Sequence, residues 1–139
     1  MTIHSFQAAH EEAVIALWHA CGLVVPQNDP RRDIARKLLV NPELFLVGER
    51  DGKVIATCMA GYEGHRGWIN YLAVAPEHQR KGFAREIMAH AEALLRAAGC
   101  PKINLQVRSA NADVIAFYEQ LGFQVDAVTS LGKRLVSDV

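Results

Sequence analysis

A strand pattern and a helix pattern meet across one short turn in the stretch YLAVAPEHQRKGFAREIM, which runs from Tyr71 to Met88. The strand pattern is apolar and breaks at Pro76. From Phe83 to Ala98, apolar side chains recur at the three- and four-residue spacing of an amphipathic helix, and Gly99 ends it. A strand and a helix joined this closely predict a sheet that is covered by helices.

The turn itself has the composition of an anion-binding site. A helix N-terminus presents unpaired backbone N–H groups and the positive end of the helix dipole. Gly82 has no Cβ to keep a ligand from the backbone, Arg80 and Lys81 add positive charge, and Gln79 is a neutral donor. The phosphate motifs G-x-x-x-x-G-K-[ST] and G-x-G-x-x-G are both absent. The sequence therefore predicts a pyrophosphate cradle, and the alternative is a solvated basic turn with an ordinary glycine.

The rest of the chain predicts a mixed sheet in the α+β or α/β class, with the element order β-α-α-β-β-β-α-β-α-β-β. Strands are expected at residues 3–6, 44–50, 53–62, 68–74, 102–107, 123–128 and 131–136. Helices are expected at residues 10–21, from 30 through 39, 83–98 and 112–121. Asp29 before Pro30 and Asn111 before the last helix are typical N-caps, and Asp51-Gly52 is typical of a two-residue hairpin turn.

Composition limits the partners that such a chain can have. The 139 residues suit a single domain over 1–139, and half of them are hydrophobic. Lys and Arg total 15 and balance the 15 Asp and Glu, so we expect neither nucleic acid nor a membrane as a partner. No apolar run approaches about 18 residues, and no signal peptide is expected. The cysteines Cys21, Cys58 and Cys100 are widely spaced, which predicts neither disulfides nor a metal site and favours a reducing cytoplasm.

A second sequence segment supports the prediction of an anion-binding turn. Together, the turn and this segment resemble the GNAT superfamily of N-acyltransferases. The family pattern Gln/Arg-x-x-Gly-x-Gly/Ala stands here as QRKGFA at residues 79–84. The second block, INLQVRSANADVIAFYEQLGF, has Asn111, Phe117, Tyr118 and Gly122-Phe123 in the family's order. The resemblance covers nearly the whole chain in order of elements. The segments NDP, GYEGHRG and SLGKRL are similar to those of small bacterial YpeA-type members.

The resemblance implies a GNAT fold, with a central, mainly antiparallel mixed sheet of about seven strands and four helices. It also implies an N-acetyltransferase in which a primary amine attacks the thioester of acetyl-CoA directly, without a metal, in a monomer or a homodimer. Tyr118 would protonate the departing thiolate. The backbone of residues 72–74 would bind the pantetheine arm like an added strand, and an N–H near Leu72 or Ala73 would polarise the carbonyl. The implied cofactor-binding residues are Leu72, Ala73, Val74, Gln79, Arg80, Lys81, Gly82, Phe83, Ala84, Asn111, Phe117 and Tyr118.

The amine must lose a proton, and the sequence leaves the base open. Glu63 is the first candidate and lies with His65 in a glycine-flanked loop; Tyr71, and Asn70 with an ordered water, are the others. Each has a plainer reading, since Glu63 can be a solvated carboxylate and Tyr118 a core aromatic. A different class of function, an acyl-CoA sensor that transfers nothing, would keep the cradle and lack the base.

Other residues are expected to serve the fold. Trp18 and Trp68 are predicted to be core residues, and each cysteine is predicted to be a small buried hydrophobe rather than a nucleophile. The loop 23–30 and the helix after it form a lid over the acceptor side in the family that the chain resembles. The basic residues of that helix are predicted to be solvated.

Overall fold

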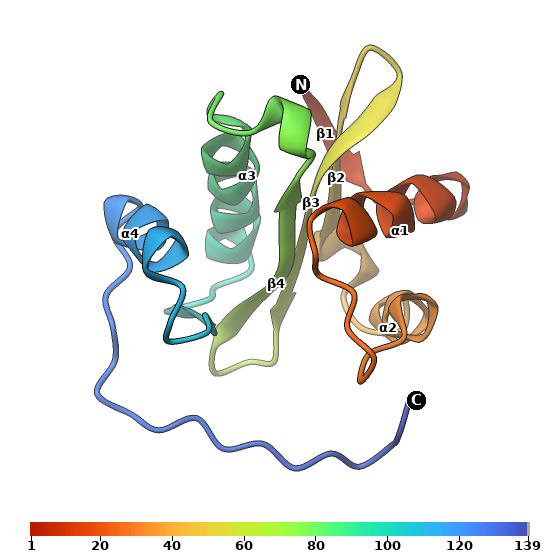
Figure 1. The fold of residues 1–139 in the computed structure, drawn as a ribbon. Helices are drawn as coiled ribbons and strands as arrows, with labels where there is room; N and C mark the ends of the chain where they lie inside the picture. The colour runs from red at the N-terminus through yellow and green to blue at the C-terminus, as the bar shows by residue number, and fades with distance from the viewer. Residues whose placement is uncertain (139) are drawn as a thin grey trace.

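The computed structural model describes residues 1–138 and contains one five-stranded mixed sheet in the order β1-β2-β3-β4-β5 (Figure 1). The strands are β1 (Thr2–Ser5), β2 (Phe45–Arg50), β3 (Lys53–Tyr62), β4 (Gly67–Val74) and β5 (Ile103–Leu105). Successive strands from β1 to β4 pair antiparallel, and β5 is parallel to β4. The helices are α1 (Glu11–Ala20), α2 (Pro30–Lys37), α3 (Phe83–Ala97) and α4 (Ala112–Gln120), with short 3-10 turns at Ala8–His10, Pro42–Leu44 and Pro76–His78. This arrangement confirms the predicted α+β class.

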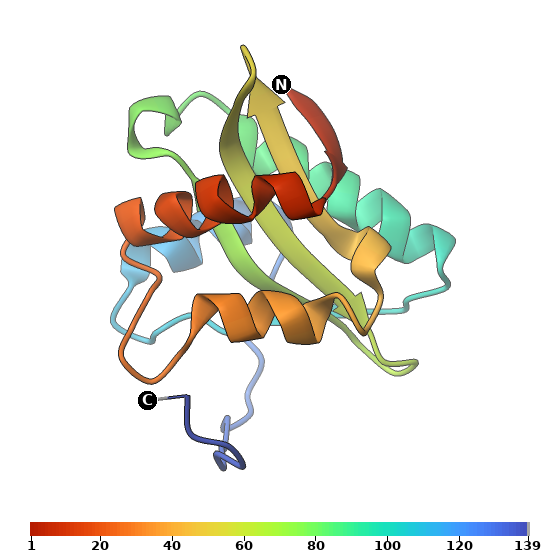
Figure 2. The same cartoon turned by 90° about the vertical axis from the view of Figure 1, so that its right-hand side faces the viewer.

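Helices cover both faces of the sheet. Figure 1 shows α3 and α4 on one side and α1 and α2 on the other. In Figure 2, α1 and α2 cross the strands one above the other, joined by a loop at one end. Within the described residues, none of the helices is long and apolar enough to cross a membrane.

Local sequence signals explain where the elements begin and turn. The carboxylate of Asp29 accepts hydrogen bonds from the backbone N–H groups of Arg31 and Arg32, which confirms the predicted N-cap of α2. Asp51 and Gly52 have φ values of 53° and 75° between β2 and β3. Two successive positive φ angles are what a tight hairpin of this twist requires.

One buried polar contact ties α1 to the centre of the sheet. Trp18 is fully buried, and its indole Nε1–H donates to the hydroxyl of Thr57 at 2.9 Å. That hydroxyl donates in turn to the backbone carbonyl of Tyr71 at 2.8 Å. The rings of Trp18 and Tyr71 stack with centroids 3.8 Å apart. The prediction of Trp18 as a core residue is therefore confirmed.

Trp68 was expected in the core as well, and that prediction is wrong, since the side chain is 37% exposed. The pleat of β4 explains the difference, because successive side chains point to opposite faces. Ile69 points inward and is 4% exposed, whereas Trp68 and Asn70 point to the other face near the edge of the sheet.

The segment after α4 also departs from expectation. Residues 123–138 contain no strand, so the two predicted closing strands are absent and the sheet has five strands rather than seven. Side chains fasten this tail beside β5 instead: Lys102 pairs with Asp126 at 2.9 Å, and Gln106 bonds Ser130. β5 pairs with β4 over only three positions, and so short a strand has few backbone hydrogen-bonding groups with which a further strand could pair.

The tail runs below the sheet and returns to α2 (Figure 1). There the Asp138 carboxylate binds Arg36 at 2.7 Å and Arg32 at 3.4 Å. The basic face of α2 was predicted to be solvated, and Arg32 and Arg36 do remain 58% and 52% exposed while they pair with the tail. Arg31 is likewise paired, with Glu11 and Glu12 of α1.

Candidate functional site

The pairing of β3 with β4 is irregular near the middle of β4. Thr57 of β3 pairs with Ala73, and Met59 pairs with Asn70, so Tyr71 and Leu72 together face one β3 residue. This is a β-bulge, and Tyr71 adopts the left-handed φ of 50° that accompanies it.

The neighbouring strand follows β4 only part of the way. The pairs Gly67–Ile103, Trp68–Asn104 and Ile69–Leu105 are parallel, and no further pairs follow within the described residues. Beyond Ile69 the two strands part, which leaves the edge of residues 70–74 without a strand beside it. Unpaired strand edges present backbone N–H and carbonyl groups to whatever lies alongside.

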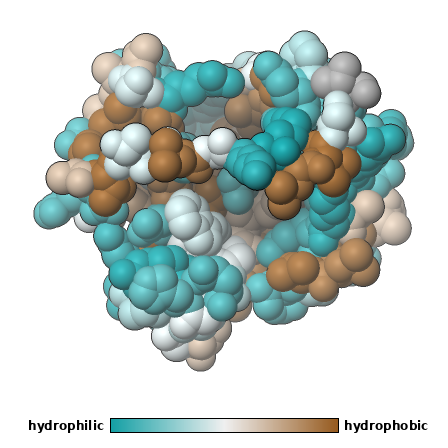
Figure 3. All heavy atoms as spheres, turned by 90° about the horizontal axis from the view of Figure 1, so that it is seen from below, coloured by the Kyte–Doolittle hydropathy of each residue, from teal (hydrophilic) through white to brown (hydrophobic). Residues whose placement is uncertain are grey.

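A cleft of about 720 Å³ occupies this opening. Its walls come from β4, the end of β5, α4, α2 and the loop before α2. Figure 3 shows the face from below as hollowed, with hydrophilic and hydrophobic side chains around the hollow. The lining residues are Leu23, Asn28, Asp33, Arg36, Lys37, Met59, Ile69, Asn70, Tyr71, Leu72, Leu105, Gln106, Val107, Arg108, Asn111, Val114 and Tyr118.

Two residues of the predicted site enter the cleft from α4. Asn111 caps this helix, its side-chain oxygen accepting from the Val114 backbone N–H at 3.4 Å. Tyr118 is 9% exposed and lies edge-on to Phe117 and Phe123, with ring centroids 5.1 Å and 5.5 Å away. Phe117 packs against the core and is not among the lining residues.

The Tyr118 side chain is a buried phenol. Burial, and next the nearby Cys58 thiol, raise the pKa of this phenol above its ordinary value. Its oxygen has no hydrogen-bond partner among residues 1–138. Burial also raises the pKa of the Cys58 thiol to about 12, so this cysteine stays protonated and is no nucleophile.

The predicted anion cradle has the expected backbone. Gly82 is the N-cap of α3 with φ 88° and ψ 4°, and Arg80 also has a positive φ of 62°. In the described part of the chain, the backbone N–H groups of residues 80–85 donate no hydrogen bond. A Cβ placed on Gly82 would meet no atom within 4 Å, so the turn faces open space. Successive free N–H groups at a helix N-terminus are a suitable arrangement for binding an anion.

A side-chain bond joins the cradle to the open edge of β4. The Gln79 amide donates to the backbone carbonyl of Val74 at 3.0 Å, and the Cys21 thiol contacts the same carbonyl at 3.2 Å. Gln79 thus holds the turn to the strand rather than projecting freely. Leu72 lines the cleft, and the buried Ala73 and Val74 continue the strand from there toward the turn.

Glu63 and His65 are not brought to the cleft. Glu63 is exposed, and its carboxylate accepts from the backbone N–H groups of His65, at 2.7 Å, and of Arg66. The N–H groups of Arg66 and then His65 lower the pKa of Glu63, which makes it a weaker base. Neither Glu63 nor His65 is among the residues that line the cleft.

Tyr71, one of the candidate bases, lines the cleft and pairs there with Asp33, which sequence analysis did not single out. The Tyr71 hydroxyl donates to Asp33 Oδ2 at 2.5 Å. Burial and then this bond to Asp33 raise the pKa of Tyr71. The two residues are 38 positions apart and on different elements, so no local pattern links them.

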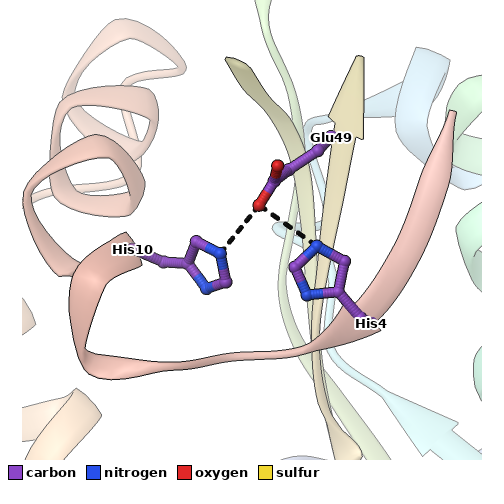
Figure 4. A group of neighbouring side chains, drawn as sticks. All are labelled: His4, His10 and Glu49. Atoms are coloured by element: carbon purple, nitrogen blue, oxygen red, sulfur yellow. Dashed lines mark ion pairs between the residues drawn. The ribbon is translucent and has the colours of Figure 1, made fainter. Parts of the chain in front are cut away.

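A separate group of titratable side chains lies at the other edge of the sheet (Figure 4). One carboxylate oxygen of Glu49 faces Nε2 of His4 at 3.1 Å and Nε2 of His10 at 2.7 Å. The three ligand atoms lie within 4.8 Å of one another, as a metal site would need. However, Nδ1 of His10 accepts from the Gln7 backbone N–H at 3.0 Å, which places the proton of the neutral ring on Nε2. That hydrogen bond opposes metal binding, and the group is best described as a hydrogen-bonded cluster.

Comparison with known proteins gives consistent results. The acetyltransferase (GNAT) family profile matches residues 8–123. An acetyltransferase of Yersinia pestis (strain Pestoides F) is 46% identical over 138 residues, covering 99% of this chain and 98% of the relative. One from Sodalis glossinidius (strain morsitans) is 48% identical over 139 residues, with the same coverage.

Solved structures share the fold. The ribosomal-protein-S18-alanine N-acetyltransferase of Escherichia coli superposes with a TM-score of 0.75 at 25% identity, covering 88% of this chain and 77% of that one. AAC(6')-Iy, in complex with the bisubstrate analog CoA-S-monomethyl-acetylneamine, has a TM-score of 0.78 at 18% identity, covering 96% and 97%.

Proposed function

Because the chain belongs to the GNAT family of acetyltransferases, we propose that it moves the acetyl group of acetyl-CoA to a primary amine within a ternary complex. The observation that carries this proposal is the continuity of three features. The cradle at Gly82, the open edge of β4 and the cleft with Tyr118 follow one another along a single strand and its turn.

In this proposal the cofactor lies along that line. Its pyrophosphate accepts hydrogen bonds from the free N–H groups around Gly82, including those of Phe83 and Ala84, while Arg80 and Lys81 supply positive charge. The pantetheine arm extends along residues 72–74 as an added strand would. Since the Val74 carbonyl already accepts from Gln79, the arm uses the other backbone groups of this edge. The complex of AAC(6')-Iy with a CoA-containing analog supports a CoA-type ligand for this fold.

The chemistry needs an oxyanion donor and an acid. The neutral amine attacks the thioester carbonyl carbon, the C–N bond forms, and the C–S bond breaks. A backbone N–H at Leu72 or Ala73 would stabilise the developing oxyanion. Tyr118 would give its proton to the departing thiolate, and the raised pKa keeps this phenol protonated until then. Asn111 caps α4, the helix that carries Tyr118 into the cleft.

The proton of the incoming ammonium leaves by another route. Asn70 and Tyr71 line the cleft, and an ordered water between them and the amine is the candidate that their position favours. Glu63 has less support as a base, because it lies outside the lining and its pKa is lowered. This first proton reaches solvent. The nitrogen loses a second proton as the C–N bond forms, and an equivalent proton returns through solvent to Tyr118, so one proton is released overall for each amide and CoA thiol formed.

The experiment is a thiol-release assay with acetyl-CoA and a panel of primary amines. Tyr118→Phe is expected to lower kcat by roughly 100-fold or more, since general acids contribute at least that much. The CoA affinity, measured by calorimetry, should stay within about twofold. Tyr62→Phe is the matched control, because the Tyr62 hydroxyl bonds the Gly64 carbonyl outside the cleft.

Two results would contradict the proposal. An unchanged kcat for Tyr118→Phe across the pH range would remove this phenol from the mechanism. Tight CoA binding without turnover on any amine would instead favour the acyl-CoA sensor.

A further inference from the structure

The charged residues that line the cleft are mostly cations. They are Arg36 and Lys37 of α2, Arg108 after β5, and one carboxylate, Asp33. The chain as a whole is neutral, so this excess is local to the cleft. Charges on the walls of a concave site act on a ligand more strongly than scattered surface charges do.

The partners of these groups show which charge is spare. Arg36 is paired with Asp33 at 3.3 Å and with Asp138 at 2.7 Å. Lys37 is half-buried and donates to the Ala60 carbonyl, and burial lowers the pKa of its amine. Arg108 is exposed and makes no ion pair with any residue between 1 and 138.

The charges on the walls of such a cleft would act differently on amines of different charge. A second cation on the acceptor would meet Arg108 and Lys37 and be repelled, whereas a carboxylate or phosphate would form charge-assisted hydrogen bonds with the arginine. Nearby cations also lower the pKa of a bound ammonium, which raises the fraction of the neutral amine that can attack. This effect matters here because Glu63, the sequence candidate for the base, lies outside the cleft.

We propose that the acceptor is a small primary amine that carries an anionic group, and that Arg108 binds this group and determines specificity. The inference rests on the proposed transferase function and adds the class of its second substrate. A carboxylate and a phosphate would satisfy the same guanidinium, so the experiment includes both.

The test compares acceptors that differ only in the anionic group. L-Alanine is compared with L-alaninamide, and O-phosphoethanolamine with ethanolamine, while spermidine represents polycations. With saturating acetyl-CoA, kcat/KM for at least one anionic member is expected to exceed that of its partner by about tenfold. Arg108→Gln should remove this preference by raising KM for the anionic amine, with kcat nearly unchanged. Measuring each pair in both proteins cancels differences in intrinsic amine reactivity.

The control and a second readout separate this inference from the transferase assignment. Arg96→Gln changes an exposed arginine on α3 that pairs with Glu92, and it should leave every ratio unchanged. Calorimetry on the protein saturated with CoA measures acceptor binding without turnover, and the anionic amine should bind more tightly than its neutral partner. A lack of turnover with this binding preference intact overturns only the transferase. Turnover that favours spermidine or the neutral partners, or an Arg108→Gln effect equal on both members of a pair, overturns the inference about the acceptor.

Discussion

Gly82→Val tests the cradle directly. Gly82 has a φ of 88°, and an L-residue held in this left-handed region costs about 1–2 kcal/mol. A domain is usually stable by about 5–15 kcal/mol, so the variant should fold, with a melting temperature lower by roughly 3–10 °C. No atom lies within 4 Å of the added Cβ, so the side chain enters the space proposed for the pyrophosphate rather than the protein interior.

The loss of cofactor affinity should exceed the loss of stability. A hydrogen bond to a charged group contributes about 1.5–3 kcal/mol, and displacing the diphosphate from one or two N–H groups costs about 3 kcal/mol. That corresponds to roughly a 100-fold weaker Kd for CoA, measured by calorimetry.

Gly99→Val is the matched control. Gly99 has a φ of 86° and likewise has no atom within 4 Å of an added Cβ, but it lies past the other end of α3. We expect a similar drop in melting temperature and unchanged CoA affinity. If Gly82→Val binds CoA as tightly as the unsubstituted protein does, or if both variants lose affinity equally, the account of the cradle is refuted.

Two further predictions concern buried polar groups. Thr57→Val should lower the free energy of unfolding, measured by urea denaturation, by about 2–4 kcal/mol, because the indole of Trp18 and the carbonyl of Tyr71 both lose a hydrogen-bond partner. A change under about 0.5 kcal/mol would show that this network does not stabilise the fold. Burial raises the pKa of both Tyr71 and Tyr118, so the unfolded chain releases these protons near pH 10 while the folded chain keeps them. Stability should therefore be full below about pH 10 and fall above it, with a shallower fall in a Tyr71→Phe, Tyr118→Phe double variant; stability that rises in this range would contradict the assigned directions.

Local signals in the sequence were sufficient for most elements. The N-caps at Asp29 and Asn111 and the turn at Asp51-Gly52 depend on a few adjacent residues, and each lies where it was predicted. The positive φ at Gly82 is local in the same way.

Features that depend on distant partners could not be predicted. Residues 123–128 and 131–136 were predicted to be strands, but a strand needs a neighbour, and β5 pairs only with β4 in the described chain. The contact between Asp33 and Tyr71 joins α2 to the bulge of β4, and the sequence around neither residue indicates this contact. Glu63 was considered as a base because of its loop, whereas its bonds to the adjacent N–H groups define its role.

Main-chain groups form one wall of the cleft and side chains form the other, and this difference affects how substitutions would change the activity. On the β4 side, the proposed grip on the cofactor uses main-chain groups, which tolerate many side-chain replacements. On the acceptor side, the loop and α2 contribute the side chains of one contiguous stretch, residues 23–37. Because Arg108 is the one proposed acceptor contact outside this stretch, exchanging residues 23–37 together with Arg108 should change the acceptor while the groups that bind the thioester stay the same.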